Sequence, residues 1–598
     1  MKHIEHLKYI PRALHMVWRN SRLITLLRLL LVLVQGILPL LTVYLMKLIV
    51  DRVTQAVSVS EPDALPILVL IAVLALTQIV VYSLGSLARF LQETQKMQVL
   101  DEQSDRIHAQ SVHVDLTYYE NAKYYDSMHR AQRQALTRPT ATFDNLTQLL
   151  QSSVSFIAML SLLLSFHWIV SILLFIAALP GIWFQLRYSD RLFHWELAHT
   201  DAMRKANYYS SLLTEDQYAK EVRLLDLGAE FIRRFHDLKK TLRQERLHLA
   251  RRRSLYEVAA QGVTVITVFG SFAFVAYRTI MGRITLGDMV MYYQAFQRGL
   301  NYLKSLLTGA ANLFEDSLYL SNLFQFLGFK PKVEDPHTPA SLPKDSEWGI
   351  SVRNVAFTYP FSRQPVFTDL SFDIRPGEHI ALAGANGSGK STLVKLICRL
   401  YDPSRGSIEI NATDIRRYKI ADLRAAMGVV FQDFSRYHLS AFENISLGDL
   451  AAEPDQTRVE QAARQSGVHK LLSDLPDGYA TTLGKRFRDG MDLSIGEWQK
   501  IALARLFIRD ARIVIFDEPT SALDAGAEYD LLQRLKTMTT GKTTIWISHR
   551  LSSAARADRV LFLQNGRITE QGPHQELINH NGDYAAFYRK QSQFYTYS

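Results

Sequence analysis

The sequence predicts two domains of different classes, an all-α domain of six transmembrane helices followed by an α/β domain of the P-loop type. The chain has 598 residues, which is too many for a single hydrophobic core. Long apolar runs lie before about residue 310, and short β-rich runs alternate with helical ones after it. A glycine-rich pattern follows one of these β-rich runs. We expect the helical domain at 1–327, a linker at 328–348 and the α/β domain at 349–598.

Five apolar stretches approach the ~20 residues that a helix needs to cross the hydrocarbon core of a membrane. The third stretch is short, so its flanking residues must contribute to the span. The apolar runs also argue against a soluble protein that acts on nucleic acid, which the formal net charge of +10 would otherwise suggest. The five stretches are Leu23 to Val50, Leu65 to Leu84, Val154 to Phe166, Ile169 to Leu186 and Val258 to Tyr277.

A sixth stretch, Ile284 to Leu307, contains several polar residues and has two interpretations. It is either an amphipathic helix outside the membrane or a transmembrane helix whose polar face avoids lipid. Three of its polar residues, Gln294, Arg298 and Asn301, are spaced at i, i+4 and i+7 and therefore share one helix face. Polar groups at membrane depth face a bundle interior or a wet cavity. We therefore predict that this face lines a substrate pathway.

The distribution of Lys and Arg predicts the orientation of these helices, because cytoplasmic loops carry an excess of basic residues. The loops 91–145 and 189–256 are rich in Lys and Arg, whereas the loop 51–64 contains only Arg52. We therefore expect the N-terminus, both long loops and the C-terminal domain in the cytoplasm. The long loops should form helical extensions with tips near Tyr118–Tyr125 and Glu215–Arg223. These extensions either contact a cytoplasmic domain or stand as solvated hairpins.

The most specific motif is the run Gly384-Ala385-Asn386-Gly387-Ser388-Gly389-Lys390-Ser391-Thr392. The β-rich run Ile380 to Ala383 precedes it and a helical run from Leu393 follows it, as a phosphate-binding loop requires. The glycines allow backbone N–H groups to surround phosphate oxygens, and the helix N-terminus adds about half a positive charge. We expect Lys390 to reach the β- and γ-phosphates of a nucleotide and Ser391 to ligate Mg²⁺.

A second element of this site is the apolar run Ile513 to Phe516, which is followed by Asp517 and Glu518. Acids at the carboxyl end of a parallel strand lie where α/β sheets bind their ligands. Asp517 is expected to hold Mg²⁺, directly or through water. Glu518 is expected to orient or deprotonate the attacking water. Together with the phosphate loop, this pair predicts nucleotide hydrolysis.

These motifs and the residues between them resemble the ATP-binding cassette (ABC) family over residues 350 to 585, approximately. The run Leu493-Ser494-Ile495-Gly496-Glu497 resembles the family signature, with Ile495 where Gly is usual and Glu497 where Gln is usual. The resemblance implies that Ser494, Gly496 and Glu497 contact a nucleotide. It implies four further roles: Tyr359 stacks on adenine, Gln432 senses the Mg²⁺ site and the membrane domain, Ser521-Ala522-Leu523-Asp524 crosses a dimer interface, and His549 contacts the γ-phosphate.

On this resemblance the cofactors are ATP and Mg²⁺. The catalytic residues are Glu518, His549 and Gln432, and the metal ligands are Ser391, Gln432 and Asp517. In the family, the signature of one cassette closes on the phosphates held by another cassette. Because the chain has one phosphate loop and one signature, we expect two copies with two-fold symmetry, with a related partner chain as the alternative. The other implied partners are the lipid bilayer and a transported substrate, and nucleic acid is not among them.

The helical domain resembles that of bacterial exporters in the same family, because six helices precede the cassette and Tyr118 to Asp126 looks like their first coupling segment. The implied function is ATP-driven export of a peptide, drug-like molecule or lipid across the bacterial cytoplasmic membrane by alternating access. The run Glu497-Trp498-Gln499-Lys500 is weakly similar to exporters of antimicrobial peptides. A lipid flippase, an importer of the same architecture and an ATP-gated channel or regulator are the alternatives.

Overall fold

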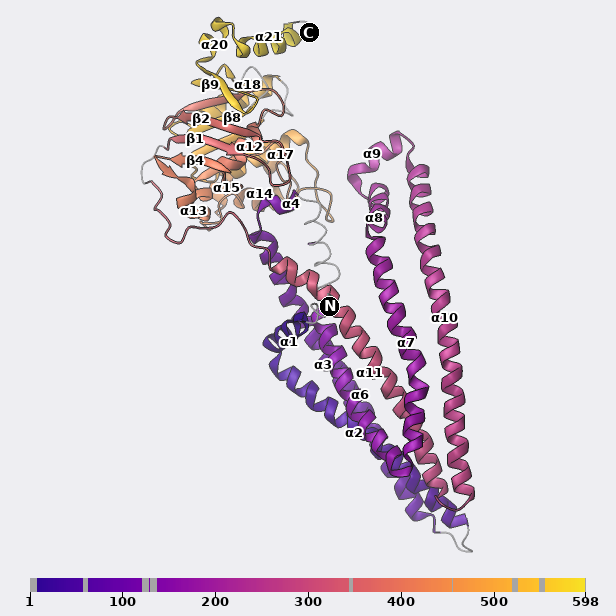
Figure 1. The fold of residues 1–598 in the computed structure, drawn as a ribbon. Coiled ribbons are helices and arrows are strands. Elements are labelled where there is room, and N and C mark those ends of the chain that lie inside the picture. The colour runs from indigo at the N-terminus through magenta and orange to yellow at the C-terminus, as the bar shows by residue number, and fades with distance from the viewer. Residues whose placement is uncertain are drawn as a thin grey trace. The chain divides into compact units, whose positions relative to one another are not determined.

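The structure is a computed structural model that describes residues 8–57, 63–120, 128, 137–343, 348–453, 455–518, 525–547 and 554–596. The chain divides into two compact units. The first unit comprises Met1–Val112 and Asp126–Phe329, and the second comprises His113–Tyr125 and Lys330–Ser598. The described part of the first unit is helical, and the strands lie in the second (Figure 1). The expected fold class, a helical domain followed by an α/β domain, is confirmed.

Four helices of the first unit, α2, α3, α6 and α10, are long and apolar enough to cross a membrane. Helix α7 begins with a shorter apolar stretch, Trp168–Gly181, and α11 does not reach the same hydropathy because polar residues recur along it. The described helices of this unit are α1 (Tyr9–Asn20), α2 (Arg22–Val57), α3 (Leu65–His113), α6 (Arg138–Phe166), α7 (Trp168–Ala198), α8 (Thr200–Thr214), α9 (Asp216–Leu224), α10 (Gly228–Ile280) and α11 (Leu286–Leu327).

The transmembrane helices have two kinds of apolar face. One kind is buried between helices, where Met159 of α6, Leu174 of α7 and Ala295 of α11 are completely inaccessible. The other kind is open, and Leu76 of α3 and Ile266 of α10 are 61% and 75% exposed. A soluble protein rarely exposes such continuous apolar surface, so these open faces are suited to lipid.

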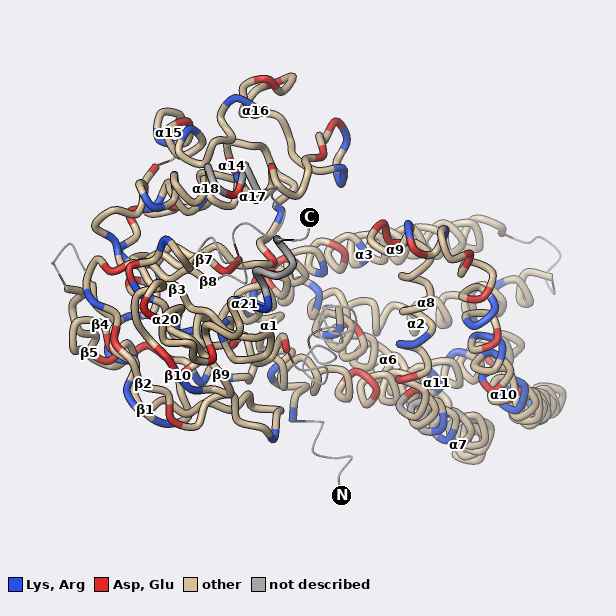
Figure 2. The backbone as a smooth tube through the Cα atoms, turned by 90° about the horizontal axis from the view of Figure 1, so that it is seen from above, with Lys and Arg blue, Asp and Glu red and all other residues tan. Residues whose placement is uncertain are grey.

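Two helices continue far beyond the thickness of a membrane. At 49 residues, α3 is about 74 Å long, and at 53 residues α10 is about 80 Å long. The hydrocarbon core is only ~30 Å thick. The polar part of α10 and the short helix α9 mix basic with acidic positions (Figure 2). In Figure 1, α7 and α10 run side by side and are joined through α8 and α9.

Several charged and polar side chains inside the helical unit pair across helices. Arg28 of α2 donates to Gln95 of α3 at 2.6 Å and to Asp144 of α6 at 2.7 Å, so one guanidinium joins three helices. At the other end of α2, Lys47 forms a 2.6 Å ion pair with Asp288 of α11. Polar groups at such depth require partners or water, and these pairs therefore stabilise a specific packing of the helices.

The second unit contains two sheets. The antiparallel sheet has the order β2-β1-β4-β5. The larger sheet has the order β10-β9-β3-β8-β7-β6, and its strands are parallel except for β10. Their bounds are β1 (Ile350–Phe357), β2 (Phe367–Ile374), β3 (His379–Ala383), β4 (Arg405–Ile410), β5 (Thr413–Asp414), β6 (Met427–Val430), β7 (Ile513–Asp517), β8 (Thr543–Ile547), β9 (Arg559–Gln564) and β10 (Arg567–Gly572).

The larger sheet positions the two predicted motifs at one edge. Strands β3 and β7 are buried along their whole length, which explains their uninterrupted apolar sequences. Both strands pair in parallel with β8, so their carboxyl ends point the same way. Strand β3 leads into the phosphate loop and helix α12 (Lys390–Ile397), and β7 ends at Asp517. The arrangement meets the requirement for a ligand site at the carboxyl ends of parallel strands.

The remaining helices of the second unit complete its cores. Helices α14, α15 and α17 enclose a separate core around Trp498 and Ile501. The short helix α4 belongs to this unit although it follows α3 in the sequence, and its Leu116 packs against the main core. The helices are α4 (Leu116–Tyr119), α13 (Ile420–Ala425), α14 (Ala441–Ser446), α15 (Gln456–Ser466), α16 (His469–Ser473), α17 (Ile495–Phe507), α18 (Ala525–Met538), α20 (His574–His580) and α21 (Asp583–Thr596).

Candidate active site

The phosphate loop forms one wall of a cavity of about 440 Å³ at the carboxyl edge of the larger sheet. The cavity gathers residues from the loop itself, from the segment after β6 and from the end of β7. It is lined by Val366, Asn386, Gly387, Gly389, Lys390, Ser391, Thr392, Gln432 and Glu518. Six of the predicted phosphate-loop residues and two of the predicted catalytic residues therefore share one cavity.

Gly389 is required by the close packing of this loop. It precedes α12 with φ +108°, a backbone conformation that side-chain-bearing residues rarely adopt. A Cβ atom at this position would lie 2.7 Å from Cε1 of Phe367. The glycine thus allows the loop to turn against β2 and to direct the N-terminus of α12 at the cavity.

The loop contains polar groups that are suited to phosphate. The hydroxyl of Ser388 is buried and has no hydrogen-bond partner among the described residues. The Nζ atom of Lys390 donates to the carbonyl oxygens of Gly384 and Ala385, at 2.9 Å each. Burial lowers the pKa of Lys390, and the carboxylates of Glu518 and Asp517 oppose that shift. An unused hydroxyl, a lysine and a helix N-terminus in one cradle make a site for a phosphate group.

Asp517 and Glu518 differ in environment although they are adjacent. Asp517 is 4% exposed, and burial raises its pKa against an opposing hydrogen bond from Ser391. Glu518 has φ +52°, which turns the chain sharply at the end of β7. Its carboxylate accepts a 2.6 Å hydrogen bond from Nε2 of Gln432. The turn therefore places one acid in the sheet and directs the other towards the cavity.

The oxygen-bearing side chains of Ser391, Gln432 and Asp517 are of the kind that Mg²⁺ prefers. Among the described residues, no group of three His, Cys, Asp or Glu side chains is arranged to hold a metal by itself. A Mg²⁺ ion here would therefore need phosphate oxygens as additional ligands, which is usual for Mg²⁺ in nucleotide sites.

Tyr359 lies in the loop after β1, within a cluster of aromatic rings. Its hydroxyl and that of Thr392 are 3.0 Å apart and share a hydrogen bond. Its ring packs edge-on against Phe357 and Tyr401, at centroid distances of 5.0 and 5.4 Å. These contacts hold the ring beside the helix that follows the phosphate loop.

The signature segment forms the start of α17. Ser494 is the N-cap, and its backbone N–H donates to Oε2 of Glu497 at 2.7 Å while the N–H of Glu497 donates to Oγ of Ser494 at 3.3 Å. Glu and Gln both complete this capping box, so Glu497 in place of the usual Gln preserves the local structure. Ser494, Gly496 and Glu497 are not among the residues that line the phosphate-loop cavity of the same chain.

The other predicted residues do not line this cavity or lie outside the part of the chain that the structure describes. Asp524 and His549 lie outside the described residues, so their roles stay predictions. Arg298 donates to Oγ1 of Thr42 on α2 at 3.3 Å, Gln294 is half-buried and Asn301 is exposed. Their role in a substrate pathway likewise stays a prediction.

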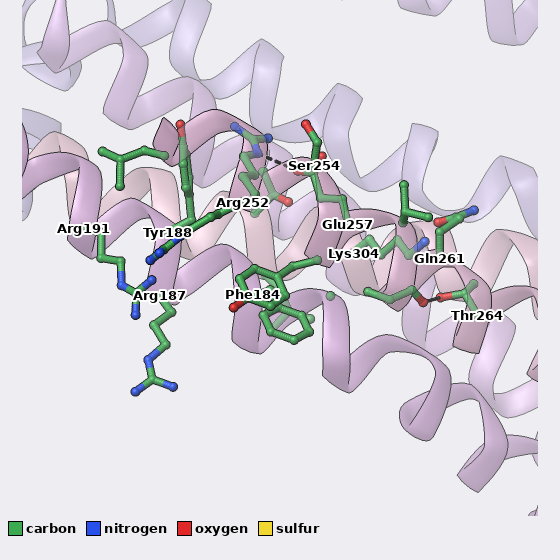
Figure 3. Close-up of a pocket in the computed structure, with 18 residues that line it drawn as sticks. Phe184, Arg187, Tyr188, Arg191, Arg252, Ser254, Glu257, Gln261, Thr264 and Lys304 are labelled. Carbon is green, nitrogen blue, oxygen red and sulfur yellow. Dashed lines mark hydrogen bonds and ion pairs between the residues drawn. The ribbon is translucent and has the colours of Figure 1, made fainter. Parts of the chain in front are cut away.

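Sequence reasoning placed Glu120 in a segment that resembles a coupling segment, but it did not predict that Glu120 contacts α12. It missed a second feature entirely. A cavity of about 880 Å³ lies between α7, α10 and α11 (Figure 3). The sequence did show the arginine cluster at 251–253, two members of which line this cavity. From the sequence alone, that cluster indicated only which side of the membrane the loop occupies.

Two family models match this chain. The model described as ABC transporter matches residues 367–521. The model described as ABC transporter transmembrane region matches residues 25–300. The first range includes the phosphate loop, the signature segment and both acids, and the second includes α3, α6, α7 and α10.

The chain is also similar to proteins of nearly its full length. It is 26% identical to the subtilin transport ATP-binding protein of Bacillus subtilis, over 96% of this chain and 92% of the relative. It is 27% identical to the nisin transport ATP-binding protein of Lactococcus lactis subsp. lactis, over 87% of this chain and 86% of the relative. A solved structure described as a bacterial Atm1-family ABC exporter with ATP bound has a TM-score of 0.81 at 24% identity, and covers 96% of this chain and 98% of that chain. The last similarity shows a shared fold.

Proposed function

From its membership of the ABC transporter family, in which this chain is an ATP-hydrolysing exporter, we propose two further properties. Two identical copies pair through their cassettes, and the pair exports a peptide from the bacterial cytoplasm. One observation carries the pairing. The phosphate-loop cavity contains Lys390, Gln432 and Glu518 but not the signature residues Ser494 and Gly496 of the same chain. A second copy related by two-fold symmetry would supply those residues to each cavity, and each copy would complete the site of the other.

Within each composite site, each of these residues would have a separate role in ATP binding or hydrolysis. Lys390 would exchange its contacts with the loop carbonyls for the β- and γ-phosphates of ATP. Glu518, held by Gln432, would orient and deprotonate the attacking water. His549 would contact the γ-phosphate, and Asp524 would lie at the interface between the cassettes. Tyr359 would stack on adenine.

Mg²⁺ would be held by Ser391, Gln432 and Asp517, together with phosphate oxygens. Bound there, the ion would neutralise charge that develops on the transferred phosphoryl group. The burial of Asp517 and its hydrogen bond with Ser391 support this assignment, because they hold two oxygen ligands together.

The proposed orientation places the N-terminus, the C-terminal cassette and the α8–α9 end of the helical unit in the cytoplasm. The mixed charges along α9 and the polar part of α10 support it, because these segments need water. ATP is also available on that side only. The bacterial cytoplasmic membrane is the corresponding location.

The peptide substrate is supported by the two relatives of nearly full length, which are named for transport of the peptides subtilin and nisin. In this proposal Gln294, Arg298 and Asn301 contribute to the pathway through the helical unit. ATP closes the cassettes, and the long helices pass that movement to the pathway.

Mixed dimers provide the test of pairing. Chains carrying Lys390→Ala and chains carrying Ser494→Ala would be co-expressed with different tags, and the mixed dimer would be purified through both tags. If each site combines two chains, the mixed dimer has one intact site and one doubly defective site. We expect it to occlude ATP at one site per dimer, whereas either variant alone occludes none. A mixed dimer without occluded ATP would show that each chain completes its own site, and the pairing proposal would be wrong.

A further inference from the structure

The chain passes from the helical unit to the second unit after Val112 and again after Phe329, and side chains join these two passages in both units. In the helical unit, Nε2 of Gln110 donates to the carbonyl oxygen of Phe329 at 2.7 Å. In the second unit, the hydroxyl of Tyr118 donates to the carbonyl oxygen of Lys330 at 3.2 Å. The segment that follows α3 and the linker that follows α11 are therefore bonded to each other.

Asp115 makes the strongest of these contacts. It is 9% exposed, and its Oδ2 accepts a 2.6 Å hydrogen bond from the backbone N–H of Lys332 while its Oδ1 accepts a 3.2 Å bond from that of Val333. It occupies the N-cap position of α4, yet its side chain makes no capping bond there. Hydrogen bonds to an ionised carboxylate are roughly twice as strong as neutral ones. Both oxygens of Asp115 are therefore used to hold the linker and not to cap the helix.

The same stretch of linker is bonded to the cassette. Arg399 is 2% exposed, and its Nη2 donates to the carbonyl oxygen of Glu334 at 2.7 Å. Oδ1 of Asp335 accepts a 2.6 Å bond from the backbone N–H of Ile420. A buried guanidinium needs acceptors for its donors, so the linker carbonyl contributes to the stability of the cassette itself. Arg399 follows the C-cap of α12, the helix that starts at the phosphate loop.

Two attachments thus meet at α12. Glu120 reaches the helix itself through Lys395, and the linker is held at the end of the helix through Arg399. A connection that only had to join two domains would need none of these bonds. We propose that residues 330–335 form a strap that fixes the segment after α3 to the cassette, so that a movement of α12 on nucleotide binding is delivered to α3 and α11 together. This inference rests on the proposed pairing of the cassettes and on the proposed transmission of their movement.

The test measures whether α3 still follows the cassette when the strap is opened. The parent protein is the full-length dimer in nanodiscs, spin-labelled at Met97→Cys on α3, where the side chain is exposed, while Cys398, which is buried, stays unlabelled. Pulsed electron paramagnetic resonance gives the distance between the labels of the two copies, without nucleotide and after trapping of ADP with vanadate. The variant is Asp115→Asn. The matched control is Glu334→Gln, which makes the same chemical change at an exposed side chain and leaves the carbonyl that Arg399 binds.

We expect trapping to change the distance in the parent protein and in Glu334→Gln. Asp115→Asn should trap as much ADP, but it should lose most of that change in distance, because α3 no longer moves with the cassette. Hydrogen exchange at the amides of Lys332 and Val333 shows directly whether the strap has opened. The exchange should be roughly tenfold faster or more in Asp115→Asn and unchanged in Glu334→Gln, since a backbone N–H that loses a charged acceptor loses its protection.

A full change in distance in Asp115→Asn, or unchanged exchange at the two amides, would overturn the proposal. If Asp115→Asn fails to trap ADP, Gln110→Leu combined with Tyr118→Phe decides, because this variant removes the two other side-chain bonds between the passages and leaves the acid in place. A full change in distance in that variant would overturn the proposal as well. The proposed function fails separately, if the labelled parent protein itself shows no change on trapping. If the parent changes and the variants change equally, only the strap fails.

Discussion

Glu120 accepts a hydrogen bond from Nζ of Lys395 at 2.7 Å, and it accepts a second from the hydroxyl of Tyr401. Lys395 belongs to α12, the helix that starts at the phosphate loop, and its Nζ lies 5.6 Å from the centroid of the Tyr359 ring. Burial lowers the pKa of Lys395, but its hydrogen bond with Glu120 and nearby charges raise it more. The segment that follows α3 in the sequence is therefore bonded to the helix of the nucleotide site, beside the aromatic residue expected to stack on adenine.

From this contact we predict that Glu120→Gln separates ATP hydrolysis from transport. The variant keeps an acceptor for Tyr401 but loses the ion pair, whose two side chains are 27% and 36% exposed. Its effect on the free energy of unfolding should be below about 1 kcal/mol, since partly exposed pairs contribute little. Basal ATP turnover should persist, and its stimulation by substrate should fall.

A double-mutant cycle with Lys395→Gln checks this assignment. If the pair carries the coupling, the double variant is no worse than either single variant. As a control, Glu102→Gln removes an ion pair with Arg106 on α3 and should leave substrate stimulation unchanged. Full stimulation in Glu120→Gln would remove the pair from the coupling path.

Glu518→Gln should retain ATP binding and lose turnover by ~10²–10⁴-fold, the usual contribution of a general base. The amide oxygen can still accept the hydrogen bond from Gln432, so the geometry at the end of β7 is preserved. Steady-state phosphate release and binding of a fluorescent ATP analogue measure the two effects. Undiminished hydrolysis would exclude Glu518 as the base.

Gly389→Ala should abolish ATP binding and destabilise the cassette. A Cβ atom at φ +108° would meet the ring of Phe367, and the strained backbone and crowding together should cost about 2–4 kcal/mol. Gly387→Ala is the matched control, because φ is +79° there but a Cβ atom meets nothing within 4 Å. Thermal unfolding should show the larger loss for Gly389→Ala. Equal losses would mean that backbone strain alone, and not contact with Phe367, explains the glycine.

The affinity for Mg²⁺ should decrease as the pH is lowered. The decrease should occur at a higher pH than it would if the ligand were an exposed aspartate. Burial raises the pKa of Asp517 above the usual ~3.9. The protonated form is thus favoured in the folded cassette, and the stability it contributes is present at low pH and lost as the pH rises through the raised pKa. Mg²⁺ needs the ionised form, so metal affinity falls when the pH drops through the same pKa.

Calorimetric titration of Mg²⁺ into the ATP-loaded Glu518→Gln protein at a series of pH values measures this dependence. Asp517→Asn should bind Mg²⁺ weakly at every pH. The control is Asp510→Asn, which removes a carboxylate that is 78% exposed. It should bind Mg²⁺ with the same pH dependence as the Glu518→Gln protein that keeps Asp510. A metal affinity that is constant down to the usual pKa of aspartate would contradict the role of Asp517.

Glu497→Gln should be nearly neutral for stability, because either side chain completes the capping box with Ser494. Glu497→Ala should destabilise α17 by about 1 kcal/mol, as other losses of a cap do. Chemical denaturation of the full chain measures both. A large loss in Glu497→Gln would show that the negative charge itself, and not the cap, is needed.

Much of the nucleotide site could be predicted from the sequence because its residues act through short segments. The phosphate loop needs glycines, a lysine and a hydroxyl in fixed order between a strand and a helix, and the structure places six of these residues around one cavity. Asp517 and Glu518 follow a buried strand and lie at the same edge of the sheet. The family resemblance, the fold class and the ATPase function are likewise confirmed.

Other features could not be predicted because they depend on residues far apart in the chain. The sequence around Glu120 resembles a coupling segment, but it does not identify Lys395, which is 275 residues away, as the partner of Glu120. The ion pair of Lys47 and Asp288 also joins distant segments. Gln294, Arg298 and Asn301 share a face of α11 as expected, whereas the cavity between α7, α10 and α11 is lined by Lys304, Leu307 and Thr308 of that helix.

By itself, the sequence determined that this protein has apolar helices followed by an ATP-hydrolysing cassette, because hydropathy and loop chemistry are local properties of the chain. Only the tertiary structure decided which side chains share a cavity, which acid touches the helix of the phosphate loop and which arginines stand together. Those relationships arise when separate helices pack side by side, and packing brings together residues that no local pattern connects.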